Sequence, residues 1–209
     1  MFSNDTKIGV LPINIGTPDK PHTPEVKRYL REFLSDPLVV DINPFMRWLL
    51  LNLVVLPRRP QQSARAYRAI WTEQGSPLLT HSLTMSARLQ ESLGDGFLVI
   101  PAMRYGNPSI SDALTQMREQ GVERLVTFPL YPQFAQSSTT TCIQEVNRLA
   151  TELLPNVEIS IVPPFFDDKR VIEAYAEQGR PVLDEFQPDF VLFSFHGLPE
   201  RHIHKSDSS

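Results

Sequence analysis

The alternation of short apolar segments with longer amphipathic ones constrains the fold of this chain more than any other feature. The short segments are rich in β-branched or aromatic residues and are bounded by Gly, Pro or Asn, which is typical of buried strands. They span 8–14, 96–102, 124–130, 157–162 and 190–195. The segments of helical period span 24–34, 80–93, 109–120, 138–154 and 169–186. Strands separated by helices need crossover connections, so the pattern predicts an α/β fold with a doubly wound parallel sheet.

The segment 109–120 carries the most complete helix signals. Ser109 can accept a backbone N–H at the start of this helix, and Gly121 can adopt the left-handed conformation that ends it. Four apolar residues fall on one helical face: Ile110, Ala113, Leu114 and Met117. We therefore expect this helix to pack on the sheet through that face.

In a doubly wound sheet, ligands bind outside the carboxyl ends of the strands. The segments that follow the expected strands are therefore where chemistry is expected, and they span 15–18, 103–108, 131–140, 163–166 and 196–199. The first of these contains one glycine and a proline instead of Gly-x-Gly-x-x-Gly, and the chain has no Walker or Gly-x-Ser-x-Gly sequence. These absences disfavour nucleotide binding and α/β-hydrolase chemistry.

Net charge and cysteine content argue against two further classes of protein, nucleic-acid binders and disulfide-stabilised domains. The chain has 20 Lys and Arg against 24 Asp and Glu, for a net charge of −4, which argues against a dedicated nucleic-acid binder. Cys142 is the single cysteine, so an intrachain disulfide framework is excluded and a reducing compartment, the cytoplasm, is expected. The polar segment 1–5 has no secretory pattern.

Three residues at expected strand ends are candidates for chemistry. His196 follows an apolar strand, where an imidazole can accept a proton or bind a divalent metal, although a lone histidine can also be structural. Arg104 and Tyr105 follow another strand. A ligand carboxylate or an internal Asp or Glu would satisfy the guanidinium.

Two further segments leave alternatives open. Hydroxyl groups are dense in 136–141, which includes Ser137 and Thr139, and they either bind an anion or cap the following helix. His202 and His204 lie in a polar terminus and are interpreted as surface residues with weak metal-binding potential.

The apolar segment 45–56 breaks the alternation. It follows Asn43-Pro44, a cap with proline at the first helical position, and we expect its helix to end at Pro57. Twelve residues make a helix of about 18 Å, which is too short to cross about 30 Å of hydrocarbon. The segment is expected in a core, an oligomer interface, a pocket wall or a bilayer surface, and Arg58-Arg59 beside it would suit anionic headgroups or be merely solvated.

Six ordered motifs together resemble the ferrochelatases, which insert ferrous iron into a porphyrin to make haem. The most specific is Ser194-Phe-His-Gly-Leu-Pro199. The others are Asn14-Ile-Gly-Thr-Pro18, Tyr29-Leu-Arg-Glu-Phe-Leu-Ser-Asp-Pro37, Ala66-Tyr-Arg-Ala-Ile-Trp-Thr-Glu-Gln-Gly-Ser-Pro77, Met103-Arg-Tyr-Gly-Asn-Pro108 and Pro129-Leu-Tyr-Pro-Gln133. The pattern is most similar to the bacterial protoporphyrin enzymes.

The resemblance implies roles for particular residues. His196 matches the family's catalytic histidine, which accepts pyrrole protons or delivers iron as a metal ligand. The porphyrin-binding positions it implies are Ile15, Tyr67, Ser76, Arg104, Tyr105, Ser137 and Thr139. The segment 45–56 matches the active-site lip, which is associated with porphyrin access and membrane contact. The resemblance implies no cofactor beyond the substrate Fe²⁺, and the single Cys142 makes an iron–sulfur cluster unexpected.

Members of the family are about one and a half times as long as this chain and carry a second α/β domain that supplies a catalytic glutamate. We therefore expect a first α/β domain over 1–165, with the lip at 44–60, and the start of a truncated second domain over 166–209. Such a chain would be poorly active and would leave an apolar sheet edge exposed. The alternatives are a non-catalytic porphyrin-binding domain and a coproporphyrin-specific ferrochelatase.

Overall fold

The computed structural model describes residues 7–200 of the chain, which form two compact units. The first unit comprises the described residues up to Leu130 together with Gln136–Val162. The second comprises Tyr131–Ala135 and the described residues from Pro163 onwards.

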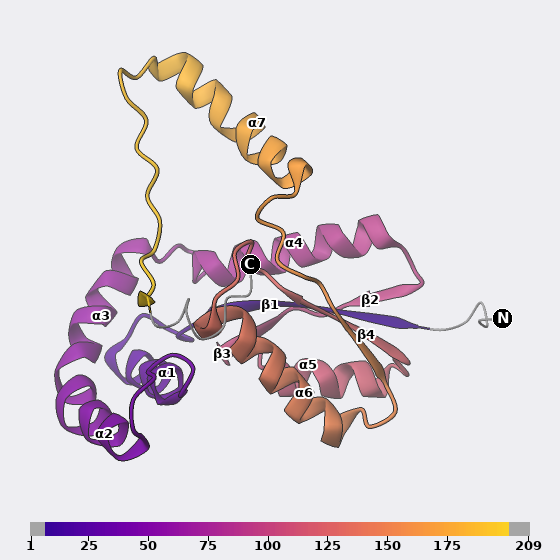
Figure 1. Cartoon of the computed structure of the whole chain (residues 1–209), viewed down its shortest axis with the longest axis horizontal. Coiled ribbons are helices and arrows are strands. Elements are labelled where there is room, and N and C mark those ends of the chain that lie inside the picture. The colour runs from indigo at the N-terminus through magenta and orange to yellow at the C-terminus, as the bar shows by residue number, and fades with distance from the viewer. Residues whose placement is uncertain (1–6, 201–209) are drawn as a thin grey trace. The chain divides into compact units, whose positions relative to one another are not determined.

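A parallel sheet forms the centre of the first unit (Figure 1). Its strands are β1 (Ile8–Thr17), β2 (Phe97–Val99), β3 (Ala102–Gly106), β4 (Arg124–Pro129) and β5 (Glu158–Ile161). The order is β2-β1-β4-β5, and β3 pairs with the second half of β1, so β1 lies in the middle. The buried side chains of β1, which include Leu11 and Ile13, give this strand its central place.

Helices cover both faces of the sheet, as the alternating sequence predicts. Figure 1 shows α4 (Pro77–Leu93) on one face and α5 (Ile110–Glu119) with α6 (Thr141–Leu153) on the other. The first unit also contains α1 (Thr23–Ser35), α2 (Pro44–Leu49), the π-helical turns η1 (Leu50–Val55) and η2 (Gln136–Thr140), and α3 (Leu56–Ile70). The second unit contains α7 (Lys169–Phe186). The α/β class predicted from the sequence is therefore confirmed.

The signals in α5 are confirmed residue by residue. The Ser109 hydroxyl accepts the Asp112 backbone N–H at 3.1 Å, and Gly121 has a φ of +70° just after the helix. The four predicted apolar residues of this helix are buried: Ile110, Ala113, Leu114 and Met117.

The boundaries of two predicted strands were wrong. The segment 96–102 forms two strands, because Pro101 lies between β2 and β3 and has no N–H to donate to a ladder. The strand β1 continues to Thr17, and β3 runs over 102–106. Arg104 and Tyr105 therefore lie on a strand instead of in the loop after it.

The prediction that the lip helix ends at Pro57 was also wrong, because α2, η1 and α3 follow one another without a break from 44 to 70. In an α-helix, the ring of Pro57 would clash with the carbonyl of Leu53. The π-helical turn changes the hydrogen-bond register, and the Leu56 N–H bonds to the Leu51 carbonyl. Pro57 then lies in the first turn of α3, where its missing N–H costs nothing.

The segment 190–195 is not a strand in the structure, which corrects the prediction made for it. A strand with apolar side chains on both faces needs neighbouring strands and covering helices, and among residues 7–200 none pairs with it. Large apolar side chains of this unit are exposed as a result, among them Tyr175, Val182, Phe186, Phe190, Leu192, Phe193 and Phe195.

Gly16 permits the closest approach between two strands of the sheet. Its φ is +112°, and a Cβ at this position would lie 1.8 Å from the Tyr105 carbonyl oxygen. Both the backbone conformation and the space therefore require glycine.

We predict that Gly16→Ala lowers the free energy of unfolding of the first unit by about 4 kcal/mol or more, because strain and backbone overlap add. The matched control is Gly121→Ala, which also has a positive φ but meets nothing within 4 Å, and should cost about 1–2 kcal/mol. Urea unfolding followed by tryptophan fluorescence measures both, since Trp48 and Trp71, the only tryptophans, lie in the first unit. Equal losses in the two variants would contradict the steric account.

Candidate functional site

An apolar cluster lies where β1 and β3 meet α1, η1 and α3. Its buried members are Val26, Tyr29, Leu30, Leu51, Leu56, Ala64 and Tyr105. Ile15 and Tyr67 are partly buried and pack against this cluster. The structure therefore brings together Ile15, Tyr67 and Tyr105, three of the predicted porphyrin-binding residues, from three different elements.

Aromatic rings give this cluster a defined geometry. The Tyr29 ring stacks with Phe33 at 5.9 Å and meets Tyr67 edge-on at 6.3 Å between centroids. Phe33 meets Tyr105 edge-on at 5.1 Å, and Tyr67 meets Trp71 at 6.4 Å. Burial raises the pKa of Tyr29, Tyr67 and Tyr105, so all three phenols remain neutral near neutral pH. The Tyr29 hydroxyl donates to the Gly16 carbonyl at 3.2 Å.

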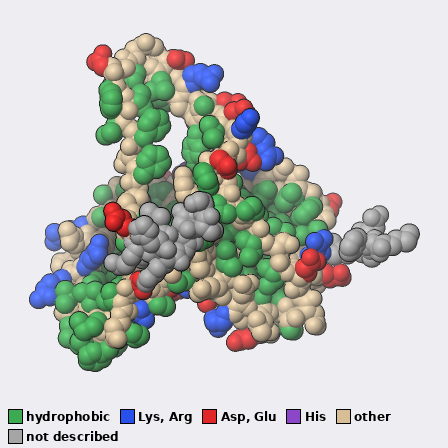
Figure 2. Space-filling view, in the orientation of Figure 1, with side chains coloured by type: hydrophobic (Ala, Val, Ile, Leu, Met, Phe, Trp, Pro, Cys, Tyr) green, Lys and Arg blue, Asp and Glu red, His purple; other side chains and the backbone are tan. Residues whose placement is uncertain are grey.

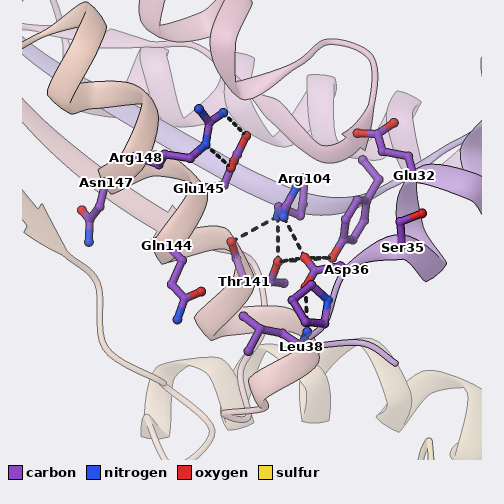
Figure 3. Close-up of a pocket in the computed structure, with 12 residues that line it drawn as sticks. Glu32, Ser35, Asp36, Leu38, Arg104, Thr141, Gln144, Glu145, Asn147 and Arg148 are labelled. Carbon is purple, nitrogen blue, oxygen red and sulfur yellow. Dashed lines mark hydrogen bonds and ion pairs between the residues drawn. The ribbon is translucent and has the colours of Figure 1, made fainter. Parts of the chain in front are cut away.

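The carboxylate of Asp36, directly after α1, collects donors from three other segments (Figure 3). Its Oδ2 accepts hydrogen bonds from Thr141 Oγ1 at 2.6 Å, Arg104 Nη2 at 2.7 Å and Tyr105 Oη at 2.8 Å. Its Oδ1 accepts the Leu38 backbone N–H at 2.7 Å. We call Asp36, Arg104, Tyr105 and Thr141 the Asp36 network; it joins α1 to β3 and α6.

Burial and hydrogen bonding shift the pKa of Asp36 in opposite directions. Burial alone would raise its pKa, but the hydrogen bonds from Thr141, the Leu38 N–H and Tyr105 outweigh it, aided by the Arg104 charge. The net result is a pKa below the ordinary value of 3.8, so Asp36 is ionised at neutral pH. A buried carboxylate in this state depends on all of its donors.

Arg104 has an internal carboxylate partner, which was one of the two alternatives left by the sequence. Besides Asp36, its Nε donates to Thr141 Oγ1 at 2.8 Å and to the Thr141 carbonyl at 3.1 Å. The guanidinium carbon lies 4.4 Å from the centroid of the Tyr105 ring. The Arg104 side chain is 15% exposed, so part of it still faces solvent.

That exposed part lines a pocket of about 730 Å³ over the Asp36 network. The far wall belongs to α6 and includes Gln144, Glu145 and Arg148, of which the last two form an ion pair at 2.8 Å (Figure 3). Both signs of charge line this pocket, and its arginines are paired with carboxylates.

The hydroxyl groups predicted to contact a porphyrin lie in two places. Ser76 is buried before α4 and donates to Thr17 Oγ1 at 2.9 Å, at the carboxyl end of β1. Ser137 and Thr139 lie in η2, where Ser137 is half-buried and Thr139 is 4% exposed with an unpartnered Oγ1 among the described residues. Thr140, at the start of α6, makes no side-chain capping bond, so the capping alternative is not observed there.

His196 is exposed and belongs to the second unit. It lies in an extended segment and not at the end of a strand, so the placement expected for it was wrong. Among the described residues of the second unit, no strand pairs with 190–195, which explains the difference. His202 and His204 lie outside the described residues. Within residues 7–200 no three His, Cys, Asp or Glu side chains form a group able to hold a metal ion.

Sequence reasoning missed the central part played by Asp36 and Thr141. A signal was present, because a carboxylate at the C-terminal end of a helix faces the negative end of the helix dipole. Asp36 occupies that position in α1, which indicates that it has partners elsewhere in the fold.

Comparison with known proteins gives a consistent result. The family model described as Ferrochelatase matches residues 7–208. Similar curated proteins are named Ferrochelatase, among them those of Coxiella burnetii (strain Dugway 5J108-111), 46% identical over 97% of this chain, and Chromobacterium violaceum, 46% identical over 96%. The Alcanivorax borkumensis protein is 44% identical over 98%. The chain spans 56%, 57% and 61% of the lengths of these relatives, respectively.

The Asp36 network predicts a specific acid response. The folded-state pKa of Asp36 is lowered, so its stabilisation is present above about pH 4, the unfolded value, and is lost as pH falls through the folded value. We predict that Asp36→Asn lowers the free energy of unfolding by about 3 kcal/mol at neutral pH. The difference from the unsubstituted chain should shrink below about pH 4.

Urea unfolding between neutral and acid pH measures this difference. The control is Asp95→Asn, an exposed residue before β2, expected to change stability by less than about 0.5 kcal/mol at neutral pH. If the difference in unfolding free energy between Asp36→Asn and the unsubstituted chain stays constant down to acid pH, the stabilisation does not come from the ionised carboxylate.

Proposed function

This chain belongs to the ferrochelatase family, and from that premise we propose that it takes part in inserting Fe²⁺ into protoporphyrin IX to form haem. The observation that carries the proposal is the family match over residues 7–208, which includes every motif quoted above. The apolar cluster of Ile15, Tyr67 and Tyr105 supports it, because a planar macrocycle needs a rigid apolar wall.

The chemistry requires the ring to distort, two pyrrole protons to leave and Fe²⁺ to lose water. A rigid wall can hold a distorted ring with binding energy from remote contacts. We assign His196 the removal of pyrrole protons or the delivery of iron, since a neutral imidazole serves either role. Ile15, with no donor atom, would face the ring as an apolar contact. We propose no cofactor beyond the substrate Fe²⁺.

The remaining predicted residues receive different parts in the proposal. Ser137 is half-buried and would bind a propionate group through its hydroxyl. Thr139 is 4% exposed and its unpartnered Oγ1 is buried, so this residue would support the wall of the site. Tyr105 is 1% exposed and Ser76 is 6% exposed, so both would act by supporting the wall. Arg104 would act mainly through the Asp36 network, with its exposed edge left for a carboxylate.

We propose that the lip segment contacts a membrane surface in the cytoplasm. Exposed apolar side chains on α2 and η1 support this contact, with Phe45 at 66% and Trp48 at 57% exposed. Figure 2 shows hydrophobic side chains gathered over α2. Among the described helices, none has the length and apolar character needed to cross a membrane.

The test is an anaerobic assay of the 209-residue chain with Fe²⁺ and either protoporphyrin or coproporphyrin, beside His196→Ala. We predict that both chains quench porphyrin fluorescence on binding, since the substitution leaves every residue of the apolar cluster unchanged. In the unsubstituted chain, haem absorbance should develop faster with protoporphyrin than with coproporphyrin. In His196→Ala the rate of haem formation should be lower by about 100-fold or more.

Other outcomes would replace the proposal. Porphyrin binding without turnover would favour a non-catalytic porphyrin-binding domain, and faster turnover of coproporphyrin would change the substrate. Haem formation that is equal in His196→Ala would remove His196 from the mechanism. Failure to bind either porphyrin would contradict the proposed function of this chain.

A further inference from the structure

A second pocket lies between α1 and the lip, and it shares Ser35 with the pocket over the Asp36 network. It has a volume of about 410 Å³. Arg31 and Ser35 line it from α1, one helical turn apart, and Arg47 and Trp48 line it from α2, with Leu51 and Asn52 from η1. Two arginines thus line one pocket whose lining contains no carboxylate.

The two arginines are held differently. Arg47 Nη1 donates to the carbonyl oxygens of Val40 at 3.2 Å and Ile42 at 3.4 Å, which fixes the guanidinium and leaves other N–H groups available. The Arg31 side chain has no hydrogen-bond or ion-pair partner within residues 7–200. The adjacent carboxylate of Glu32 does not line the pocket, and its Oε2 accepts the Gly106 N–H at 3.1 Å.

Two like charges that share a pocket repel each other unless an anion lies between them. Guanidinium groups bind phosphate oxygens through paired N–H donors, and a serine hydroxyl and an asparagine amide add neutral hydrogen bonds. The composition of this pocket therefore fits a phosphate group.

The surroundings indicate which phosphate. Trp48 lines the pocket and is also part of the exposed apolar surface of the lip, together with Phe45, Met46, Leu53 and Val54. Tryptophan side chains are favoured where apolar and aqueous phases meet. A ligand with an anionic head and an apolar tail would satisfy the pocket and the surface beside it.

We infer that the pocket of Arg31 and Arg47 binds the phosphate of an anionic phospholipid when the lip lies on a membrane. This inference rests on the proposed membrane contact of the lip and is independent of metal insertion. It assigns a headgroup site to residues that the family resemblance left without a role.

The test measures partition of the full chain between buffer and vesicles of phosphatidylglycerol or phosphatidylcholine, at about 0.15 M salt. The ratio of the two partition coefficients is informative, because the apolar surface of the second unit contributes to both. We expect phosphatidylglycerol to be preferred by about tenfold or more, and Arg31→Gln with Arg47→Gln to remove most of that preference.

The matched control is Arg88→Gln with Arg118→Gln, which removes the same charge from exposed positions on α4 and α5, outside both the lip and the pocket. We expect it to change the ratio by less than about threefold. Arg31→Gln alone is the second variant: it breaks no side-chain hydrogen bond or ion pair within residues 7–200, so it tests the pocket even if loss of the Arg47 anchor impairs folding.

Several results would overturn the inference. If the pocket pair and the control pair reduce the ratio of partition coefficients equally, the attraction is a diffuse effect of surface charge. If the pocket variants leave the ratio unchanged, the two arginines do not bind a headgroup. Saturable binding of inorganic phosphate, with no preference between vesicles, would indicate a soluble phosphate ligand. Weakened porphyrin binding in Arg31→Gln would indicate a porphyrin carboxylate instead. Failure to bind either vesicle would contradict the membrane contact itself, while leaving the haem assay unaffected.

Discussion

The ionised carboxylate of Asp36 is the interaction on which the arrangement of the first unit depends. A buried charge is stable only when its lone pairs are satisfied, and its donors come from β3, from α6 and from the loop after α1. Because β3 and α6 are distant from Asp36 in sequence, the carboxylate fixes where α1 ends relative to the sheet. Tyr105 links this carboxylate to the apolar cluster that we assign to porphyrin binding, because its hydroxyl donates to Asp36 and its ring contacts Phe33.

The lip depends on a second constraint, the prolines at 57 and 60. The helical run from 44 to 70 accommodates Pro57 through the π-helical turn η1, which changes the hydrogen-bond register before it, whereas Pro60 lies inside α3. The apolar residues of α2 and η1 are thereby presented on one continuous helix. Leu51 and Leu56 point into the apolar cluster, whereas Phe45, Met46 and Leu53 are exposed.

The sequence predicts the α/β class and the positions of most helices because burial and helix capping are local. Ser109 and Gly121 illustrate this, since cap and stop residues act within one turn. The course of β3 depends on pairing with β1, a long-range contact that a short apolar run does not reveal. The run through Pro57 was missed because a π-helical turn is rare.

The candidate site was predicted in part. The aromatic residues and Arg104 were named from motifs, but the partner of Arg104 is fixed only by the fold. Asp36 lies 68 residues away from it in sequence, and no local pattern links the two. The strand at 190–195 was predicted from its composition, yet a strand forms only where neighbours pair with it.

A double-mutant cycle between Asp36 and Arg104 tests the central claim most directly. The free energy of unfolding would be measured at neutral pH for Asp36→Asn, Arg104→Gln and the double variant, from the fluorescence of Trp48 and Trp71. If the two groups stabilise each other as the 2.7 Å contact indicates, the losses of unfolding free energy in the two single variants add up to more than the loss in the double variant. The expected difference is about 2 kcal/mol. Losses that add to within about 0.5 kcal/mol would contradict the claim that this carboxylate organises the site.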